Sequence, residues 1–159
     1  MPLRFVAKRE LLRRRLFARC LRRLGVGFVE RVQAQRGVLD AQRLARIAGE
    51  GSRLCVFAEG TFRRAPGLLG FHLGAFRVAV QARVPVVPMA LRGTRDLLPD
   101  ETWWPRRCAL QLVIGDARMP SAQAGDEFAE AARLMRASRE FVLDACGEPD
   151  AAHVLVVPA

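Results

Sequence analysis

Hydrophobic residues along the 159-residue chain follow two alternating patterns. Short apolar runs typical of buried strands lie at Arg4–Ala7, Phe28–Glu30, Arg53–Ala58, Pro85–Leu91 and Arg107–Ile114. Between them, apolar residues at helical spacing predict helices at Arg9–Leu24, Leu39–Gly49, Leu73–Arg83 and Asp126–Ala145. Strands that alternate with helices favour an α/β fold with a mostly parallel central sheet flanked by helices.

Two segments interrupt this alternation. Gly93–Pro105 contains two adjacent tryptophans, and we expect a loop whose rings either anchor at a membrane surface or pack in the ordinary way. Residues 1–147 are expected to form one domain, and residues 148–159 a C-terminal tail. That tail is expected to fray or to add an edge strand at Val154–Val157.

Composition excludes several classes of protein. Hydrophobic residues make up 51% of the chain, enough for a core, but no apolar run approaches the roughly 18 residues that span a bilayer. Charged residues near the N-terminus interrupt any secretory signal. The four cysteines have no metal-ligand spacing and suit a reducing cytoplasm: Cys20, Cys55, Cys108 and Cys146.

Positive charge is concentrated at one end of the chain. The formal net charge is +10, and residues 1–31 hold ten basic side chains against two acidic ones. The basic amphipathic helix predicted at Arg9–Leu24 lies either on anionic lipid headgroups or on the sheet with a solvated arginine face. Nucleic-acid binding would need basic residues over a continuous face with interleaved aromatic residues, and the chain has no tyrosine.

The segment after the third predicted strand has the chemistry of an anion site. Glu59 and Gly60 follow an apolar run at its C-terminal end, where open α/β sheets bind ligands. Gly60 lets a ligand approach the backbone, and Thr61 offers a hydroxyl. Arg63 or Arg64 can donate two parallel hydrogen bonds to phosphate oxygens.

Three sequence blocks carry a family resemblance. FAEGTFRR at Phe57–Arg64 resembles the (F/V)PEGT(R/F) block of the phospholipid/glycerol acyltransferases, PlsC-type enzymes that include 1-acylglycerol-3-phosphate acyltransferases, although Ala58 replaces the usual proline. VPVVPM at Val84–Met89 is similar to the family's VPIVPV block, and GVGFVER at Gly25–Arg31 to its GxxFI(D/E)R block. With the blocks in the family's order, the chain is identified as a member.

The resemblance implies a reaction and a site. A fatty acyl group would pass from acyl-CoA or acyl-carrier protein to a lysophosphatidate-type acceptor, bound by Arg31, Glu59, Gly60, Thr61 and Arg63. Glu59 either contacts a glycerol hydroxyl or pairs with Arg31 to hold the loop. The resemblance further implies no metal, no cofactor beyond the acyl donor, no nucleic-acid partner, and a cytoplasmic protein peripheral to the inner face of the membrane.

The family's catalytic HxxxxD motif, whose histidine acts as general base, does not occur in this sequence. His72 is followed five positions later by Arg77, and His153 by Pro158. RFVAKREL at Arg4–Leu11 resembles the family segment just downstream of that motif. We therefore assign no catalytic residue and expect an N-terminally truncated domain, inactive alone, as a shortened gene model or a remnant. The alternative is a non-catalytic basic module that binds membranes or nucleic acid.

Overall fold

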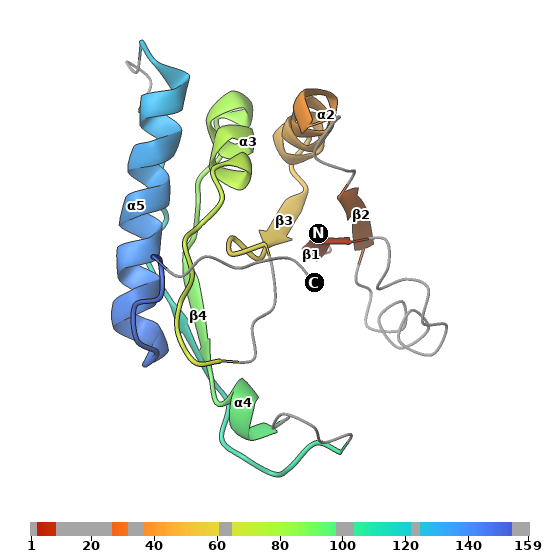
Figure 1. The fold of residues 1–159 in the computed structure, drawn as a ribbon. Coiled ribbons are helices and arrows are strands. Elements are labelled where there is room, and N and C mark those ends of the chain that lie inside the picture. Colours follow the sequence, from red (N-terminus) through yellow and green to blue (C-terminus); the bar gives the residue numbers. More distant parts are fainter. Residues whose placement is uncertain are drawn as a thin grey trace.

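A computed structural model describes residues 3–8, 27–31, 37–60, 65–97, 104–121 and 125–153. The fold is mixed α/β (Figure 1). Its strands are β1 (Leu3–Lys8), β2 (Gly27–Arg31), β3 (Arg53–Val56), β4 (Met89–Arg92) and β5 (Gln111–Ile114). Its helices are α2 (Gly37–Gly49), α3 (Gly74–Ala82), α4 (Thr94–Leu97) and α5 (Glu127–Cys146).

The N-terminal strands form a parallel sheet of order β2-β1-β3. On the central strand, Val6 lies opposite Val29 of β2 and Val56 of β3. These strands confirm three of the predicted apolar runs, although β3 stops at Val56, short of Ala58. The helix predicted at Arg9–Leu24, between β1 and β2, lies outside the described residues.

β4 and β5 form a second, antiparallel sheet, with Met89 opposite Ile114. The prediction of a mostly parallel central sheet is therefore correct for β1–β3 and wrong for this pair. Within the described connection from β4 to β5, only the one-turn helix α4 occurs, and no long helical crossover carries the chain back to a parallel start. The predicted strand Pro85–Leu91 is also shortened, because its prolines lack the N–H that a strand ladder needs.

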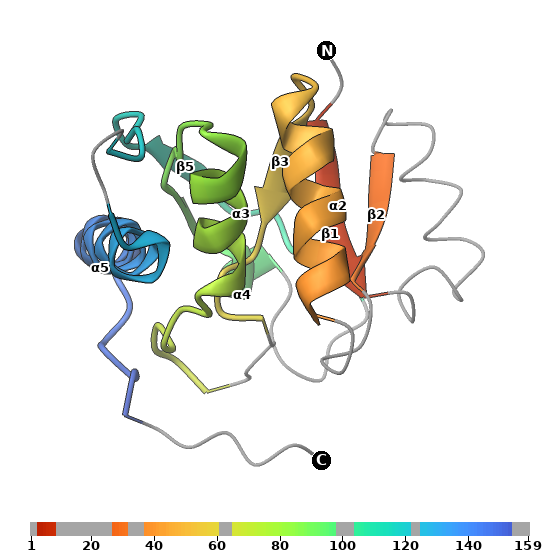
Figure 2. The ribbon, with the colours of Figure 1, turned by 90° about the horizontal axis from the view of Figure 1, so that it is seen from above.

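α3 lies between α2 and α5 and contacts both. In Figure 2, α2 and α3 lie in front of the strands, and α5 is seen end-on beside them. All three confirm predicted helices. Phe76 of α3 packs against Ala131 and Leu134 of α5, both of which are fully buried. A second cluster joins α5 to β4 through Leu68, Ala90 and Val142. Both clusters hold the segment that follows β3 against α5.

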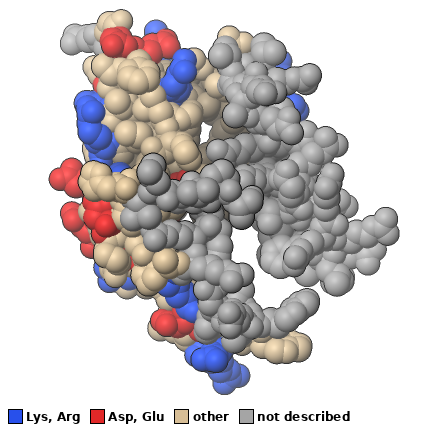
Figure 3. All heavy atoms as spheres, viewed as in Figure 1, with Lys and Arg blue, Asp and Glu red and all other residues tan. Residues whose placement is uncertain are grey.

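The predicted last helix is confirmed at both ends. Asp126 caps α5 by accepting hydrogen bonds from the amides of Phe128 and Ala129, at 2.8 and 3.3 Å. Gly147 ends the helix at φ 74°, in the left-handed region that favours glycine. Acidic and basic side chains are visible along the edge of the molecule where α5 lies (Figure 3). Among the described residues, no helix is long and apolar enough to cross a membrane.

The packing of α3 on α5 predicts a large difference between two positions of α5. Leu134 is fully buried and Phe128 is 62% exposed. We expect Leu134→Ala to lower the free energy of unfolding by about 2–5 kcal/mol, because it opens a cavity in the core. Phe128→Ala, the control on the same helix, should change it by less than about 0.5 kcal/mol. Urea titration followed by circular dichroism measures both, and equal losses would contradict this assignment of the core.

Candidate functional site

The predicted anion loop leaves the sheet after β3 and returns at the start of the segment leading to α3. The amide of His72 donates a hydrogen bond to the carbonyl of Ala58 at 2.8 Å, so the two ends of the excursion are joined. Gly60 has φ 68° and donates its amide proton to the carbonyl of Phe57 at 3.1 Å. A side chain at Gly60 would be strained in this turn, which explains the need for glycine.

The carboxylate of Glu59 forms a hydrogen bond that joins the two ends of the loop. Its Oε2 accepts a hydrogen bond from the amide of Leu69 at 2.9 Å, and Leu69 is only 4% exposed. The sequence left two roles open for Glu59, namely contact with a glycerol hydroxyl or holding the loop. The structure shows a contact that suits the second role, made with the backbone amide of Leu69. The alternative partner, the side chain of Arg31, lies outside the described residues.

Those predicted site residues that the structure describes lie at one edge of the parallel sheet. Arg31 is the last residue of β2, and Glu59 and Gly60 follow the end of β3. Because β2 and β3 both run parallel to β1, their C-terminal ends lie at the same edge. Thr61 and Arg63 fall in residues 61–64, outside the described residues. The backbone thus brings Arg31, Glu59 and Gly60 to one edge.

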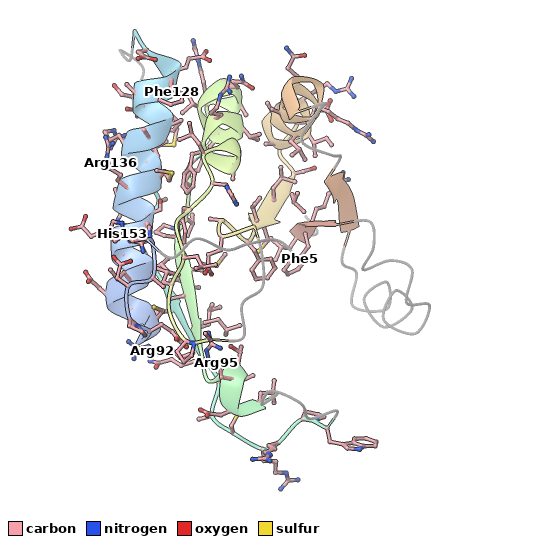
Figure 4. All side chains as sticks on the ribbon, in the orientation of Figure 1. Phe5, Arg92, Arg95, Phe128, Arg136 and His153 are labelled. Atoms are coloured by element: carbon pink, nitrogen blue, oxygen red, sulfur yellow. The ribbon has the colours of Figure 1, made fainter. Side chains whose placement is uncertain are left out.

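The two histidines have no catalytic surroundings in the part of the chain that the structure describes. Both side chains are exposed, and neither imidazole forms a hydrogen bond or an ion pair with a described residue. His72 contributes its backbone amide to loop closure. Figure 4 labels His153 close to α5. A general base needs an orienting partner for its second nitrogen. Among the described residues, Asp150 interacts electrostatically with His153, but its carboxylate is hydrogen-bonded to Arg139.

A pocket of about 250 Å³ lies where β4 and α5 end, lined by residues 91–96 and 146–148. Arg92 and Arg95 lie close together at this end of the molecule (Figure 4). Each is bonded to the protein: the Nε of Arg92 donates to the carbonyl of Ala145, and that of Arg95 to Glu148 at 2.7 Å. Both guanidinium groups at this pocket are therefore bonded to other residues of the protein. The described residues contain no group of three metal-ligating side chains.

Sequence reasoning missed a set of contacts just downstream of the loop. The amide of Leu68 donates to the carbonyl of Pro149, and the carbonyl of Leu68 accepts from the amide of Ala151, both at 2.9 Å. Residues 148–151 are thus held against the loop, where the sequence suggested fraying. The only local signal was the pair of acidic residues Glu148 and Asp150 directly after the helix-ending Gly147.

Comparison with known proteins identifies the class. A family model described as "Acyltransferase" matches residues 1–92, more than half of the chain. The chain therefore belongs to the acyltransferase family, and the resemblance found in its sequence is confirmed.

The relatives and a solved structure agree with this membership. A 1-acyl-sn-glycerol-3-phosphate acyltransferase of Chlamydomonas reinhardtii is 31% identical over 110 residues, which cover 69% of this chain and 33% of that protein. The human 1-acyl-sn-glycerol-3-phosphate acyltransferase alpha is 34% identical over 92 residues, which cover 57% of this chain and 32% of that protein. The chain thus spans about a third of the length of these relatives.

The fold has a counterpart among crystal structures. The 1-acyl-sn-glycerophosphate acyltransferase PlsC from Thermotoga maritima superposes with a TM-score of 0.59 at 23% identity. The match covers 86% of this chain and 55% of the Thermotoga chain. At this identity, the likeness establishes a shared fold.

The hydrogen bond between Glu59 and the Leu69 amide predicts that removing the Glu59 carboxylate destabilises the protein. Glu59→Ala leaves a buried amide without its acceptor, so we expect the unfolding free energy to fall by about 1–3 kcal/mol. Glu59→Gln keeps an acceptor oxygen and should cost less. Hydrogen exchange at the Leu69 amide should quicken in the alanine variant.

Glu50→Ala is the control for this comparison. The side chain of Glu50 forms an exposed pair with Arg46 at 3.9 Å, so its removal should cost less than about 0.5 kcal/mol. A Leu69 amide that exchanges equally slowly in Glu59→Ala and in the unchanged protein would disprove the closing role of Glu59.

Proposed function

We propose that this chain supplies the acceptor-binding part of an acyltransferase, which transfers a fatty acyl group to a lysophosphatidate-type acceptor in phospholipid biosynthesis. The carrying observation is the glycine turn after β3, closed by Glu59, at the edge where the parallel strands end. Family membership supports the reaction, because the relatives named above are 1-acyl-sn-glycerol-3-phosphate acyltransferases.

In this proposal each site residue has a physical task. Gly60 gives the phosphate access to the backbone, and the Thr61 hydroxyl donates one hydrogen bond to it. Arg63 donates two parallel hydrogen bonds, and Arg31 adds positive charge from the neighbouring strand end. Glu59 fixes the loop through Leu69 and lies beside the glycerol part of the acceptor.

One step of this reaction needs a proton acceptor, and we assign no residue of this chain to that role. The acceptor's free hydroxyl oxygen attacks the thioester carbonyl, the carbon–sulfur bond breaks, and the thiol of the donor leaves. A general base must take the hydroxyl proton. The 159 residues contain no HxxxxD sequence, and we propose that the base comes from outside them, so that this chain binds the acceptor without turning it over. The donor, acyl-CoA or acyl-carrier protein, is a substrate, and the proposal requires no metal or other cofactor.

Phosphate recognition by the loop is tested by titration calorimetry with a short-chain lysophosphatidate. Thr61→Ala removes one hydrogen bond to the charged phosphate and Arg63→Ala removes two. Each such bond is worth about 1.5–3 kcal/mol, so we expect either variant to raise the Kd about tenfold or more. Arg46→Ala, an exposed arginine of α2, should leave the Kd unchanged.

A second ligand separates phosphate recognition from lipid recognition. A monoacylglycerol of the same chain length lacks the phosphate, and its weaker binding should be insensitive to Thr61→Ala and Arg63→Ala. Equal affinity for the two lipids, or unchanged affinity of both variants for the phosphorylated one, would refute the proposed acceptor site.

We further propose that the chain contacts an anionic membrane surface from its cytoplasmic side through the segment before β5. Trp104 is 82% exposed, and the nearby Arg106 and Arg107 are exposed as well. Tryptophan favours the membrane–water interface, and arginine is attracted to anionic headgroups. The basic segment Arg9–Leu24 adds charge of the same sign.

Membrane contact is measured by co-sedimentation with vesicles of phosphatidylcholine and phosphatidylglycerol. Each arginine near the surface is worth about 1 kcal/mol, so Arg106→Gln with Arg107→Gln should weaken binding by more than about tenfold and reduce its salt dependence. Trp104→Ala should weaken binding at all salt concentrations. Phe128→Ala, an exposed aromatic residue on α5, is the matched control. Unchanged binding of all variants would exclude this segment as the contact.

A further inference from the structure

The segment just downstream of the loop, residues 65–69, has a buried part that belongs to no helix or long strand. Gly67, Leu68 and Leu69 are buried. Most of their backbone groups are bonded to residues far along the chain, in α5 and beyond it. The amide of Gly67 donates to Glu148 Oε2 at 2.7 Å, 81 residues away in sequence.

Arg139 of α5 is the central donor. Its Nε donates to the carbonyl of Leu69 and its Nη2 to the carbonyl of Leu68, both at 3.1 Å. The same guanidinium pairs with both carboxylate oxygens of Asp150, at 3.2 and 2.5 Å. Its side chain is only 17% exposed. One cation therefore ties α5, the segment 65–69 and the C-terminal segment together.

The carboxylate of Asp150 is charged in the folded protein at neutral pH. The hydrogen bond from Arg139, followed by one from the amide of Ala152, lowers the pKa of Asp150 from 3.8 to about 2. The contribution of this pair to stability is present above the unfolded pKa near 4 and is lost as the pH falls toward 2. The contact is thus closed at any physiological pH.

Arg95 makes a second attachment from α4. Its Nε lies 2.7 Å from Glu148 Oε1, and its Nη2 donates to the carbonyl of Ala65 at 3.1 Å. Glu148 thereby uses one carboxylate oxygen for Arg95 and the other for Gly67. Ala65 is the first described residue after the loop residues 61–64, so this bond anchors the point where the loop ends.

Gly67 shows how closely the C-terminal segment approaches. A Cβ atom there would lie 2.7 Å from the Cβ of Ala151 and 3.3 Å from the carbonyl oxygen of Pro149. Its φ of 126° is also one that other residues rarely adopt. The segment Glu148–Ala151 therefore fits directly against a backbone that has no room for a side chain.

These contacts form a continuous path to the predicted acceptor site. Asp150 bonds to Arg139, Arg139 to the carbonyl of Leu69, and the amide of Leu69 to the carboxylate of Glu59. Glu59 and Ala65, on either side of residues 61–64, each have a bonded partner in the folded chain. A binding site whose flanking residues are already ordered loses less conformational entropy when its ligand arrives.

Resting on the acceptor site proposed above, we propose that Arg139, Arg95, Glu148 and Asp150 are positioning residues that hold residues 65–69 and Glu59 in place for binding of the acceptor's phosphate. We call these four residues the clamp. All of them lie beyond residue 92, where the match to the family model ends. None of them is assigned a contact with the acceptor; they act through the backbone of residues 65–69 and through Glu59.

The test compares Arg139→Gln with Arg139→Lys and with Arg136→Gln. Arg136 is an exposed arginine on the same helix and serves as the matched control (Figure 4). The probe is glycerol 3-phosphate, titrated calorimetrically into the full chain. Arg139→Gln should raise the Kd for glycerol 3-phosphate about tenfold, because binding must then also supply the conformational entropy of ordering about one backbone residue. It should also speed hydrogen exchange at the Gly67 and Leu69 amides. Arg139→Lys should recover part of the affinity, and Arg136→Gln should match the unchanged protein.

Asp150→Asn keeps the experiment informative if Arg139→Gln does not fold, which circular dichroism reports. It leaves the two bonds from Arg139 to the loop backbone in place and weakens the ion pair, so a smaller rise in Kd in the same direction is expected. Affinity that survives Arg139→Gln or Asp150→Asn, with exchange at Leu69 accelerated, would overturn the clamp and leave the acceptor site standing. An unchanged protein that binds no glycerol 3-phosphate would overturn both.

Discussion

The burial of an irregular segment is the constraint on which this structure depends. Residues 67–69 are buried, yet they belong to no helix or long strand that would satisfy their backbone groups. An unpaired buried amide or carbonyl costs about 1–3 kcal/mol, so partners must come from elsewhere. Glu59 and Glu148 supply acceptors, and Arg139 supplies donors. The position of the C-terminal segment follows from this requirement.

Local patterns predicted the elements well, because they depend on nearby residues. The apolar spacing of Leu73–Arg83 and Asp126–Ala145 identified α3 and α5 to within a residue or two. The turn at Gly60 was likewise readable, since glycine after a short apolar run signals a ligand loop. Much of the site's backbone was therefore predictable from about twenty consecutive residues.

Pairing across long distances was not predictable in the same way. The apolar run at Pro85–Leu91 is consistent with either strand direction, and its pairing with β5 depends on the path of the connecting loop. Arg139 contacts residues about 70 positions earlier, and nothing in its sequence neighbourhood separates it from Arg136 one turn before. Only the folded chain shows that one arginine is mostly enclosed and the other exposed.

Binding and proton transfer make different demands, so the acceptor site and the general base proposed above can come from different residues. A phosphate is held by backbone amides, hydroxyls and guanidinium groups, whose value lies in a fixed geometry. A general base must instead reach the reacting hydroxyl and have an oriented, titratable nitrogen. His72 contributes only its backbone amide to loop closure within the described residues. The family-matched residues 1–92 thus contain the proposed phosphate loop, and the remaining two fifths of the chain contribute Arg95, Arg139, Glu148 and Asp150, which are bonded to the segment just downstream of it or to one another.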